Sequence, residues 1–381
     1  MTEIIASPVS VENDSATVKV TPLTVPGLYM KPYSRCVRIS PNQVFLMGIG
    51  AGAPRPRNRR AARVQHEKPV CMIATIAEDG TVSTAPVPSD LPRESEAVCL
   101  GGKVYVYSIS DDDDSTRFVE LSLDTLEWKD ITGKDCPQHT YYYDSIPSTP
   151  RLVGVSDTEL LLLSCPRSDD SCQVHDIIKT WVYDCVGNTW ERCADGPRTP
   201  DLSDDCDQWD YSAAMVGSRV HVVSSVFGGG SNSSHCAFSL PSSGCPGGHW
   251  DRMTLAGDSL CGHLQSLGSG LGLSFHQTFV DCYDAVRHTW SPVLGDLDRE
   301  GRTKDCQDFC YLDGYATFTS CALDAETVFV ACSSHHWWVE QSDKLVTGAY
   351  LVTVDRDAAR EMCTTVPDQV TEVYERSDED E

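Results

Sequence analysis

The sequence predicts an all-β fold, a six-bladed β-propeller, on three observations. Short runs of alternating apolar and polar residues, bounded by Gly, Pro, Asp and Ser, recur along the chain, whereas helical periodicity is scarce. Three near copies of one strand each follow a short turn, at 103–108, 219–224 and 327–332. A tyrosine–tryptophan motif also recurs with a fixed spacing. Repeated β units in a chain of 381 residues are typical of a closed propeller.

The tyrosine–tryptophan motif is clearest in residues 183–190 and 283–290, which share Tyr, Asp, Val, Thr and Trp in register. Residues 121–128 keep the same spacing with Leu in place of Tyr. Two strands joined by a tight polar turn give this pattern, with the tryptophan opening the outer strand. Because neighbouring blades diverge away from the axis, a large aromatic residue there fills the wedge between them. Trp250 is predicted to play the same part after a longer connection at 241–248.

These segments resemble the kelch repeat, in which a di-glycine turn joins two apolar strands and a Tyr-Asp pair is followed by a tryptophan. The residues that carry the resemblance are Gly101, Gly102, Trp128, Tyr183, Trp190, Trp250, Tyr283 and Trp290. The first and last predicted blades lack the tryptophan. In the last, Val354 and Asp355 hold the Tyr-Asp position and Glu361 stands in place of Trp. The resemblance therefore implies a divergent kelch-like propeller.

The predicted propeller spans residues 34–367, with blades at 34–90, 94–135, 148–196, 209–256, 259–295 and 314–367. Residues 1–33 form an N-terminal extension in which 16–20 are a candidate ring-closing strand. Closure matters because an open ring leaves sheet edges unpaired. Seven blades are the alternative if this extension holds more than one closing strand. Residues 368–381 are acidic and are predicted to be a disordered tail.

Composition favours a cytoplasmic protein that binds neither nucleic acid nor membrane. The mean hydropathy is −0.27, and the apolar runs are far shorter than the roughly 20 residues of a membrane-spanning helix. The first residues lack the basic start and apolar stretch of a signal peptide. Without secretion, we expect the 18 cysteines to be free thiols that pack as small apolar residues. The net charge of −26 repels phosphate backbones and anionic lipid and favours a basic partner surface.

The long or unusual segments of the chain are predicted to lie on one face, where second-to-third-strand loops and connections between blades emerge. The candidate binding residues of this face are Arg55, Arg57, Arg59, Arg60, Tyr141, Tyr142, Trp209, His335, His336, Trp337 and Trp338. The arginines could bind an acidic peptide or phosphate, or could pair with nearby aspartates or be disordered. The aromatic residues could stack on a sugar or peptide, or could pack between blades.

No catalytic residue, metal ligand or cofactor is predicted. The nearest candidate for zinc, Cys306 and Cys310, has an unusual spacing, and no paired CxxC motif accompanies it. Kelch-like propellers commonly act as protein-interaction platforms. The resemblance therefore implies a monomeric adaptor or scaffold for a protein partner of unknown identity. The alternative is a propeller enzyme or a sugar-binding lectin with its site at the mouth of the central channel. The Glu-x-x-x-Asp-x-x-x-His pattern of iron-dependent relatives is missing, which disfavours that enzyme class.

Overall fold

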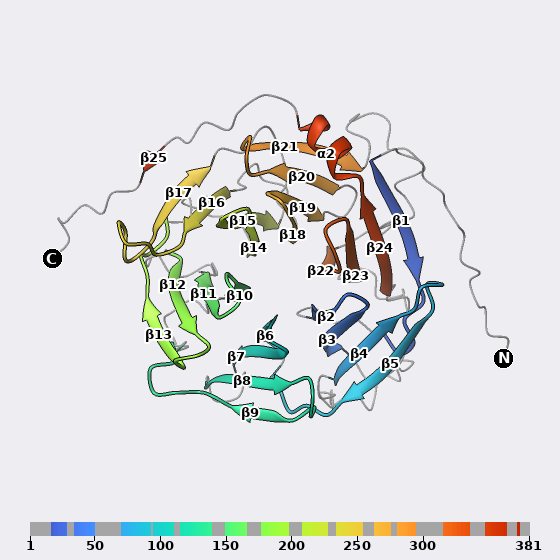
Figure 1. The fold of residues 1–381 in the computed structure, drawn as a ribbon, viewed down its shortest axis with the longest axis horizontal. Coiled ribbons are helices and arrows are strands. Elements are labelled where there is room, and N and C mark those ends of the chain that lie inside the picture. The colour runs from blue at the N-terminus through green and yellow to red at the C-terminus, as the bar shows by residue number, and fades with distance from the viewer. Residues whose placement is uncertain are drawn as a thin grey trace, which may run out of the picture.

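The computed structural model describes residues 17–28, 34–49, 70–92, 94–109, 115–138, 149–165, 177–197, 208–227, 234–253, 263–275, 280–294, 315–335, 347–363 and 372–373. These residues form six antiparallel sheets arranged around a central axis (Figure 1). The predicted all-β, six-bladed propeller is therefore confirmed.

Each sheet is one blade, and its strands follow the chain from the axis outward. Blade 1 contains β2 (Arg35–Ser40), β3 (Gln43–Ile49), β4 (Val70–Ile76) and β5 (Val82–Val87). Blade 2 contains β6 (Glu94–Leu100), β7 (Lys103–Ile109), β8 (Thr116–Ser122) and β9 (Trp128–Asp130). Blade 3 contains β10 (Thr149–Gly154), β11 (Glu159–Cys165), β12 (Lys179–Asp184) and β13 (Thr189–Arg192).

The second half of the ring repeats this order until its last blade. Blade 4 contains β14 (Gln208–Val216), β15 (Arg219–Phe227), β16 (Ser234–Ser239) and β17 (His249–Met253). Blade 5 contains β18 (His263–Gly268), β19 (Leu271–Phe275), β20 (Val280–Asp284) and β21 (Thr289–Leu294). Blade 6 contains β22 (Tyr315–Ala322), β23 (Thr327–His335), β24 (Thr347–Val354) and, as its outermost strand, β1 (Val18–Leu23).

The ring is closed by this N-terminal strand. β1 pairs antiparallel with β24, from Val18 opposite Val354 to Leu23 opposite Ala349. Blade 6 is therefore built from the two ends of the propeller sequence. Completing this blade requires a contact between strands that are distant in sequence, which raises the entropy cost of forming it.

The tyrosine–tryptophan motif forms the hairpin between the third and fourth strands. Tyr183 lies opposite Trp190, and Tyr283 lies opposite Trp290, with ring centroids 4.7 and 4.8 Å apart. Trp128 lies opposite Leu121, and Trp250 lies opposite Phe238. The di-glycine turn, Gly101 and Gly102, joins β6 to β7 with φ values of 58° and 74°, a backbone conformation that side chains with a Cβ rarely adopt.

The last blade differs from its predicted form. Glu361, which falls where the repeat would place its tryptophan, lies in a helix and not in a fourth strand. Asp355 instead caps a short helix, α2 (Arg356–Met362), by accepting hydrogen bonds from the backbone N–H groups of Asp357 and Ala358. The chain leaves the sheet after Val354, and β1 takes the place of the fourth strand.

The segment predicted as a disordered tail includes one short strand. Glu372–Val373 form β25, which pairs with Asp251 and Arg252 of β17 and adds a fifth strand to blade 4. The other residues of 368–381 lie outside the described residues, as do residues 1–16.

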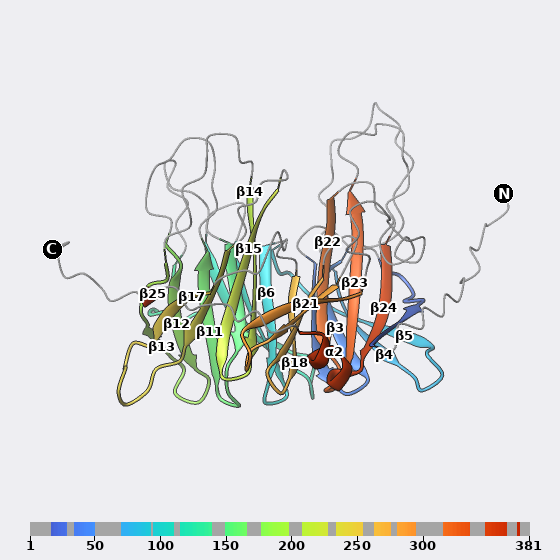
Figure 2. The same cartoon turned by 90° about the horizontal axis from the view of Figure 1, so that it is seen from above.

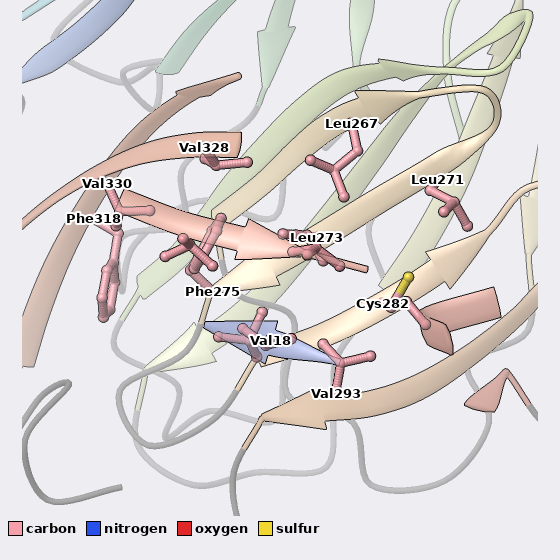
Figure 3. Close-up of a cluster of buried hydrophobic side chains, with 14 of the residues drawn as sticks. Val18, Leu267, Leu271, Leu273, Phe275, Cys282, Val293, Phe318, Val328 and Val330 are labelled. Carbon is pink, nitrogen blue, oxygen red and sulfur yellow. The ribbon is translucent and has the colours of Figure 1, made fainter. Parts of the chain in front are cut away.

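The hydrophobic core lies between the blades. Between blades 5 and 6, Val18 shares a buried cluster with Phe275 of β19 and Phe318 of β22 (Figure 3). Equivalent clusters combine residues of neighbouring blades around the ring, such as Phe45 of blade 1 with Val106 of blade 2. Because the apolar faces of a blade are covered by its neighbours, the strands of each blade are apolar on both faces.

The two faces of the ring differ in their connections. The turns between first and second strands and between third and fourth strands lie on one face together with α2 (Figure 2). We call this the turn face. Second-to-third-strand loops and connections between blades leave from strand ends on the opposite face, which we call the rim face. The innermost strands β2, β6, β10, β14, β18 and β22 all begin at the rim face.

Truncation of a core side chain tests this packing. Phe275 is 0% exposed, so Phe275→Ala should lower the free energy of unfolding by about 3–5 kcal/mol, because it leaves a cavity between blades 5 and 6. Urea unfolding measures the change. Val186→Ala is the matched control, since Val186 is 76% exposed and its loss should change little. A loss below about 1 kcal/mol for Phe275→Ala would contradict the described core.

Candidate binding site at the propeller axis

Most of the predicted rim residues lie outside the described residues. These are Arg55, Arg57, Arg59, Arg60, Tyr141, Tyr142, His336, Trp337 and Trp338. The backbones of Trp209 and His335 are described. Trp209 pairs with Val226 near the start of β14, and His335 pairs with Tyr315 at the end of β23. Both positions are strand ends on the rim face, in blades 4 and 6.

The described residues instead reveal a charged group at the axis, which we call the axial cluster: Arg35, Glu96, Arg151 and His263. Its carboxylate is held by two guanidinium groups from the flanking blades. Glu96 Oε1 accepts hydrogen bonds from Arg35 Nε and Arg151 Nη1, each at 2.7 Å, and Arg35 Nη2 lies 2.6 Å away. The three side chains are 18% (Arg35), 9% (Glu96) and 11% (Arg151) exposed, so the ion pairs are largely shielded from water.

Backbone carbonyl groups fix the orientation of both arginines. Arg35 Nη1 donates to Ser34 O at 3.0 Å, and Arg151 Nη1 donates to Pro150 O at 2.9 Å. Arg151 Nε donates to Tyr211 O of β14 at 2.6 Å, which links blade 3 to blade 4. Planar guanidinium groups suit such a site because their donors point in fixed directions.

The electrostatics of the cluster favour an ionised Glu96. Burial alone would raise the pKa of its carboxyl group, but the charges of Arg35 and Arg151 outweigh burial, so the pKa is lowered. Two positive charges and one negative charge leave the three side chains with one net positive charge. This local surplus stands out in a chain whose net charge is −26.

His263 of β18 completes the cluster as a neutral imidazole. Its Nε2 accepts a hydrogen bond from the backbone N–H of Ser320 at 3.2 Å, so the ring proton resides on Nδ1. Burial, together with the positive charges of Arg35 and Arg151, lowers the pKa of His263 to about 3. The histidine therefore adds no charge at neutral pH.

Similar contacts continue around the axis, so that each pair of adjacent innermost strands is joined through a side chain. Ser212 Oγ of β14 accepts from the backbone N–H of Leu264 in β18 at 2.7 Å. His263 joins β18 to β22, and Thr319 Oγ1 of β22 accepts from the backbone N–H of Cys36 in β2 at 2.8 Å. The axial cluster is thus the charged part of a closed ring of hydrogen bonds.

The axial cluster was not among the predicted site residues, because those residues were expected in the long loops. One sequence feature could have indicated the cluster: charged residues stand near the starts of predicted innermost strands, directly before apolar residues. Glu96 precedes the apolar run 97–100, and Arg151 precedes the apolar pair Leu152 and Val153. Sequence order alone could not show that these residues meet.

A second buried polar group lies between blades 4 and 5. His221 Nδ1 and His235 Nε2 are 2.9 Å apart, and the ring of Tyr283 lies 4.9 Å from each imidazole. His221 Nε2 and His235 Nδ1 are buried without a hydrogen-bond partner in the described part of the chain. Burial lowers the pKa of His221 to about 3 and that of His235 well below its usual value. Among the described residues, no three His, Cys, Asp or Glu side chains are placed to hold a metal ion.

Comparison with known proteins establishes the fold and no family. No model of a known protein family and no curated sequence matches the chain. Its structure is similar to the GH93 α-L-arabinofuranosidase of Fusarium graminearum, solved with arabinobiose, with a TM-score of 0.53 and 12% identity over 88% of this chain and 97% of that chain. A protein of unknown function from Dyadobacter fermentans gives a TM-score of 0.47 and 12% identity, covering 89% of this chain and 99% of that chain.

In the described residues, no helix is long and apolar enough to cross a membrane.

Removal of the central carboxylate tests the axial cluster. Glu96→Gln should lower the free energy of unfolding by about 3 kcal/mol, because Gln cannot neutralise two shielded guanidinium groups. Urea unfolding at pH 7 measures this loss. Asp90→Asn is the control: Asp90 pairs with Arg117 at 3.4 Å but its side chain is 72% exposed, so its loss should cost under about 1 kcal/mol. Equal losses in the two variants would mean that the cluster is no stronger than a surface ion pair.

The buried histidines predict a steep acid dependence of stability. His221, His235 and His263 stay neutral in the folded protein but take up protons near pH 6.5 when unfolded, so stability falls as pH drops below 6.5. Burial raises the pKa of Asp281 to about 7, which opposes this trend with one proton. The net effect is two protons, or about 3 kcal/mol lost per pH unit between pH 6 and 4.5.

Urea unfolding at several pH values measures that slope. Glu96 has a lowered pKa in the folded protein and takes up a proton near pH 4.5 when unfolded, so it adds to the loss only at the acid edge of this window. A free energy of unfolding that stays constant or rises as the pH falls from 6 to 4.5 would show that at most one of the three imidazoles stays neutral in the folded protein, and would contradict the prediction.

Proposed function

We propose that this protein is a binding platform that holds a protein partner on its rim face and places one acidic group of that partner at the axial cluster. The observation that carries the proposal is the net positive charge at the start of the innermost strands, set within a strongly acidic chain. Arg35 and Arg151 already hold one carboxylate between them, which is the chemistry such a group would need.

The hydrogen-bonding capacity of Arg35 supports this role. Its donors contact Glu96 and Ser34, and its remaining N–H groups have no acceptor among the described residues. An unused donor on a partly exposed guanidinium group can bind a second carboxylate or a phosphate. The low exposure of the cluster strengthens such a contact because few water molecules compete for it.

The overall charge restricts the partner. A chain of net charge −26 repels an acidic protein at long range and attracts a basic one. The partner that fits both observations has a basic surface and a single acidic side chain that reaches the axis. Rim loops then contact the basic surface, while the axial cluster fixes its register.

We also propose that the blades are kelch repeats and that the protein is cytoplasmic. We assign the blades to divergent kelch repeats, supported by the opposed Tyr183–Trp190 and Tyr283–Trp290 pairs and the turn at Gly101 and Gly102. We place the protein in the cytoplasm as an adaptor or scaffold. The thirteen cysteines of the described residues are all free thiols, which favours a reducing compartment.

A small-molecule site at the axis is the second candidate, either in an enzyme or in a sugar-binding lectin. The observation that favours it is a carboxylate beside a neutral imidazole, Glu96 and His263, which could together bind and polarise hydroxyl groups. A carboxylated sugar would suit the net positive charge of the cluster.

Affinity purification followed by mass spectrometry distinguishes the two candidates. The intact protein is compared with Arg35→Ala, with replacement of residues 51–68 by a short Gly/Ser linker, and with a turn-face control, Val186→Asp with Val286→Asp. Arg151 still neutralises Glu96 in Arg35→Ala, so the variant should fold, which circular dichroism checks. We expect a stoichiometric protein partner that the control retains, and whose affinity for Arg35→Ala falls about tenfold or more in calorimetry.

Two outcomes would contradict the platform. A partner bound equally by all variants would place the interface away from the rim face. A purified protein without any protein partner, but with a small molecule detected by native mass spectrometry and lost in Arg35→Ala, would establish the second candidate.

A further inference from the structure

Helix α2 fastens the end of blade 6 to blade 5. Ser291 Oγ of β21 donates to Met362 O at 2.7 Å, and Arg360 Nη2 donates to Ser269 O at 3.0 Å. Arg360 Nε also lies 3.5 Å from the buried carboxylate of Asp284. Thr17, next to β1, contacts the sulfur of Met362 at 3.3 Å. The helix therefore contacts blade 5 and both strands that close the ring.

Two thiols meet where α2 ends. Cys363 follows the last residue of the helix, and its Sγ donates to Cys282 O of β20 at 3.8 Å. Both cysteines belong to the cluster between blades 5 and 6 and are buried, Cys282 at 0% and Cys363 at 2% exposure. Cys282 is labelled in Figure 3. Side-chain contact between them brings the two sulfur atoms together across 81 residues of sequence.

The surroundings make the two thiols unequal. Hydrogen bonding between the two side chains and the charge of Arg287 lower the pKa of Cys363, against burial and the charge of Asp284. The same hydrogen bonding and burial raise the pKa of Cys282. Of the two sulfurs, Cys363 therefore has the larger thiolate fraction, which favours it as the attacking cysteine and Cys282 as the resolving one.

We propose that Cys282 and Cys363 form a reversible disulfide that locks α2 onto blade 5 when the cell is exposed to peroxide. The Cys363 thiolate attacks one oxygen of hydrogen peroxide, giving a sulfenic acid and hydroxide, which takes up a proton to become water. The Cys282 thiol then attacks the sulfenic sulfur, forming the S–S bond and releasing a second water. Two thiols are oxidised by two electrons and one peroxide is reduced; a dithiol reductant reverses the bond.

Both sulfurs are buried, so the reaction requires a local opening of α2, a helix of seven residues that hydrogen bonds and one ion pair hold to blade 5. Local openings of this kind occur without unfolding of the whole protein, and a peroxide molecule is small enough to enter during one. Once formed, the disulfide removes that opening and holds the ring-closing blade in place.

Peptide mapping of the full-length protein under non-reducing conditions tests the proposal directly. After treatment with hydrogen peroxide, we expect one linked peptide pair that contains Cys282 and Cys363. Its mass should be lower than that of the two separate peptides by two hydrogens, and dithiothreitol should restore the separate peptides. Amide hydrogen exchange across residues 356–363 should slow by roughly tenfold in the oxidised protein. Because this measurement uses the natural sequence, its outcome does not depend on the folding of a variant.

Single substitutions separate the roles of the two sulfurs. In Cys282→Ala, the Cys363 sulfenic acid has no partner and should be trapped by dimedone, whereas Cys363→Ala should leave Cys282 unoxidised. Cys36 and Cys321 provide an internal comparison: they are also a buried pair in contact, but they lie between blades 6 and 1, away from α2 and its local opening, so this pair should stay reduced at the same peroxide dose. Absence of the linked peptide, or linkage of Cys36 to Cys321 before Cys282 to Cys363, would overturn the proposal.

Discussion

Closure of the ring is the constraint on which the rest of this structure depends. Each blade buries apolar side chains against its neighbours, so blades 1 and 6 each leave an apolar face uncovered until the two meet. β1 meets this requirement by pairing with β24, and its Val18 enters the same cluster as Phe275 and Phe318. The core, the axial contacts and the position of α2 all follow from bringing the two ends of the chain into one sheet.

The axial cluster shows how stability and binding can share the same side chains. Glu96 satisfies two guanidinium groups and thereby joins three blades, which offsets the cost of shielding those charges from water. The net positive charge that remains is a consequence of this arrangement, and it lies at the face from which the long loops leave. A partner group that binds there gains from donors whose orientation the fold has already fixed.

The closing region combines interactions that respond to different conditions. Asp284 holds Arg360 through a buried carboxylate, while Cys282 and Cys363 lie in the adjacent cluster. The ion pair and the hydrogen bonds of α2 are reversible contacts of modest strength, whereas a disulfide is covalent. Oxidation would therefore add a covalent bond to a region that is otherwise held by reversible contacts.

Local patterns in the sequence were sufficient for the blades and insufficient for the sites. Alternating apolar residues, the Gly101–Gly102 turn and the tyrosine–tryptophan hairpins are short-range signals, and they placed six blades because each blade is a local unit. In blade 6 the repeat pattern ended early: Glu361 fell where the tryptophan would be, but Asp355 caps a helix there. The outer strand comes from residues 18–23, which overlap the candidate closing strand at 16–20. Arg35, Glu96 and Arg151 are at least 55 residues apart from one another, as are Cys282 and Cys363, so no local pattern could pair them. The sequence alone determined the repeating unit, because its hydrogen bonds and turns are local; the tertiary structure alone decided which charges and thiols meet, because only ring closure brings distant strands together.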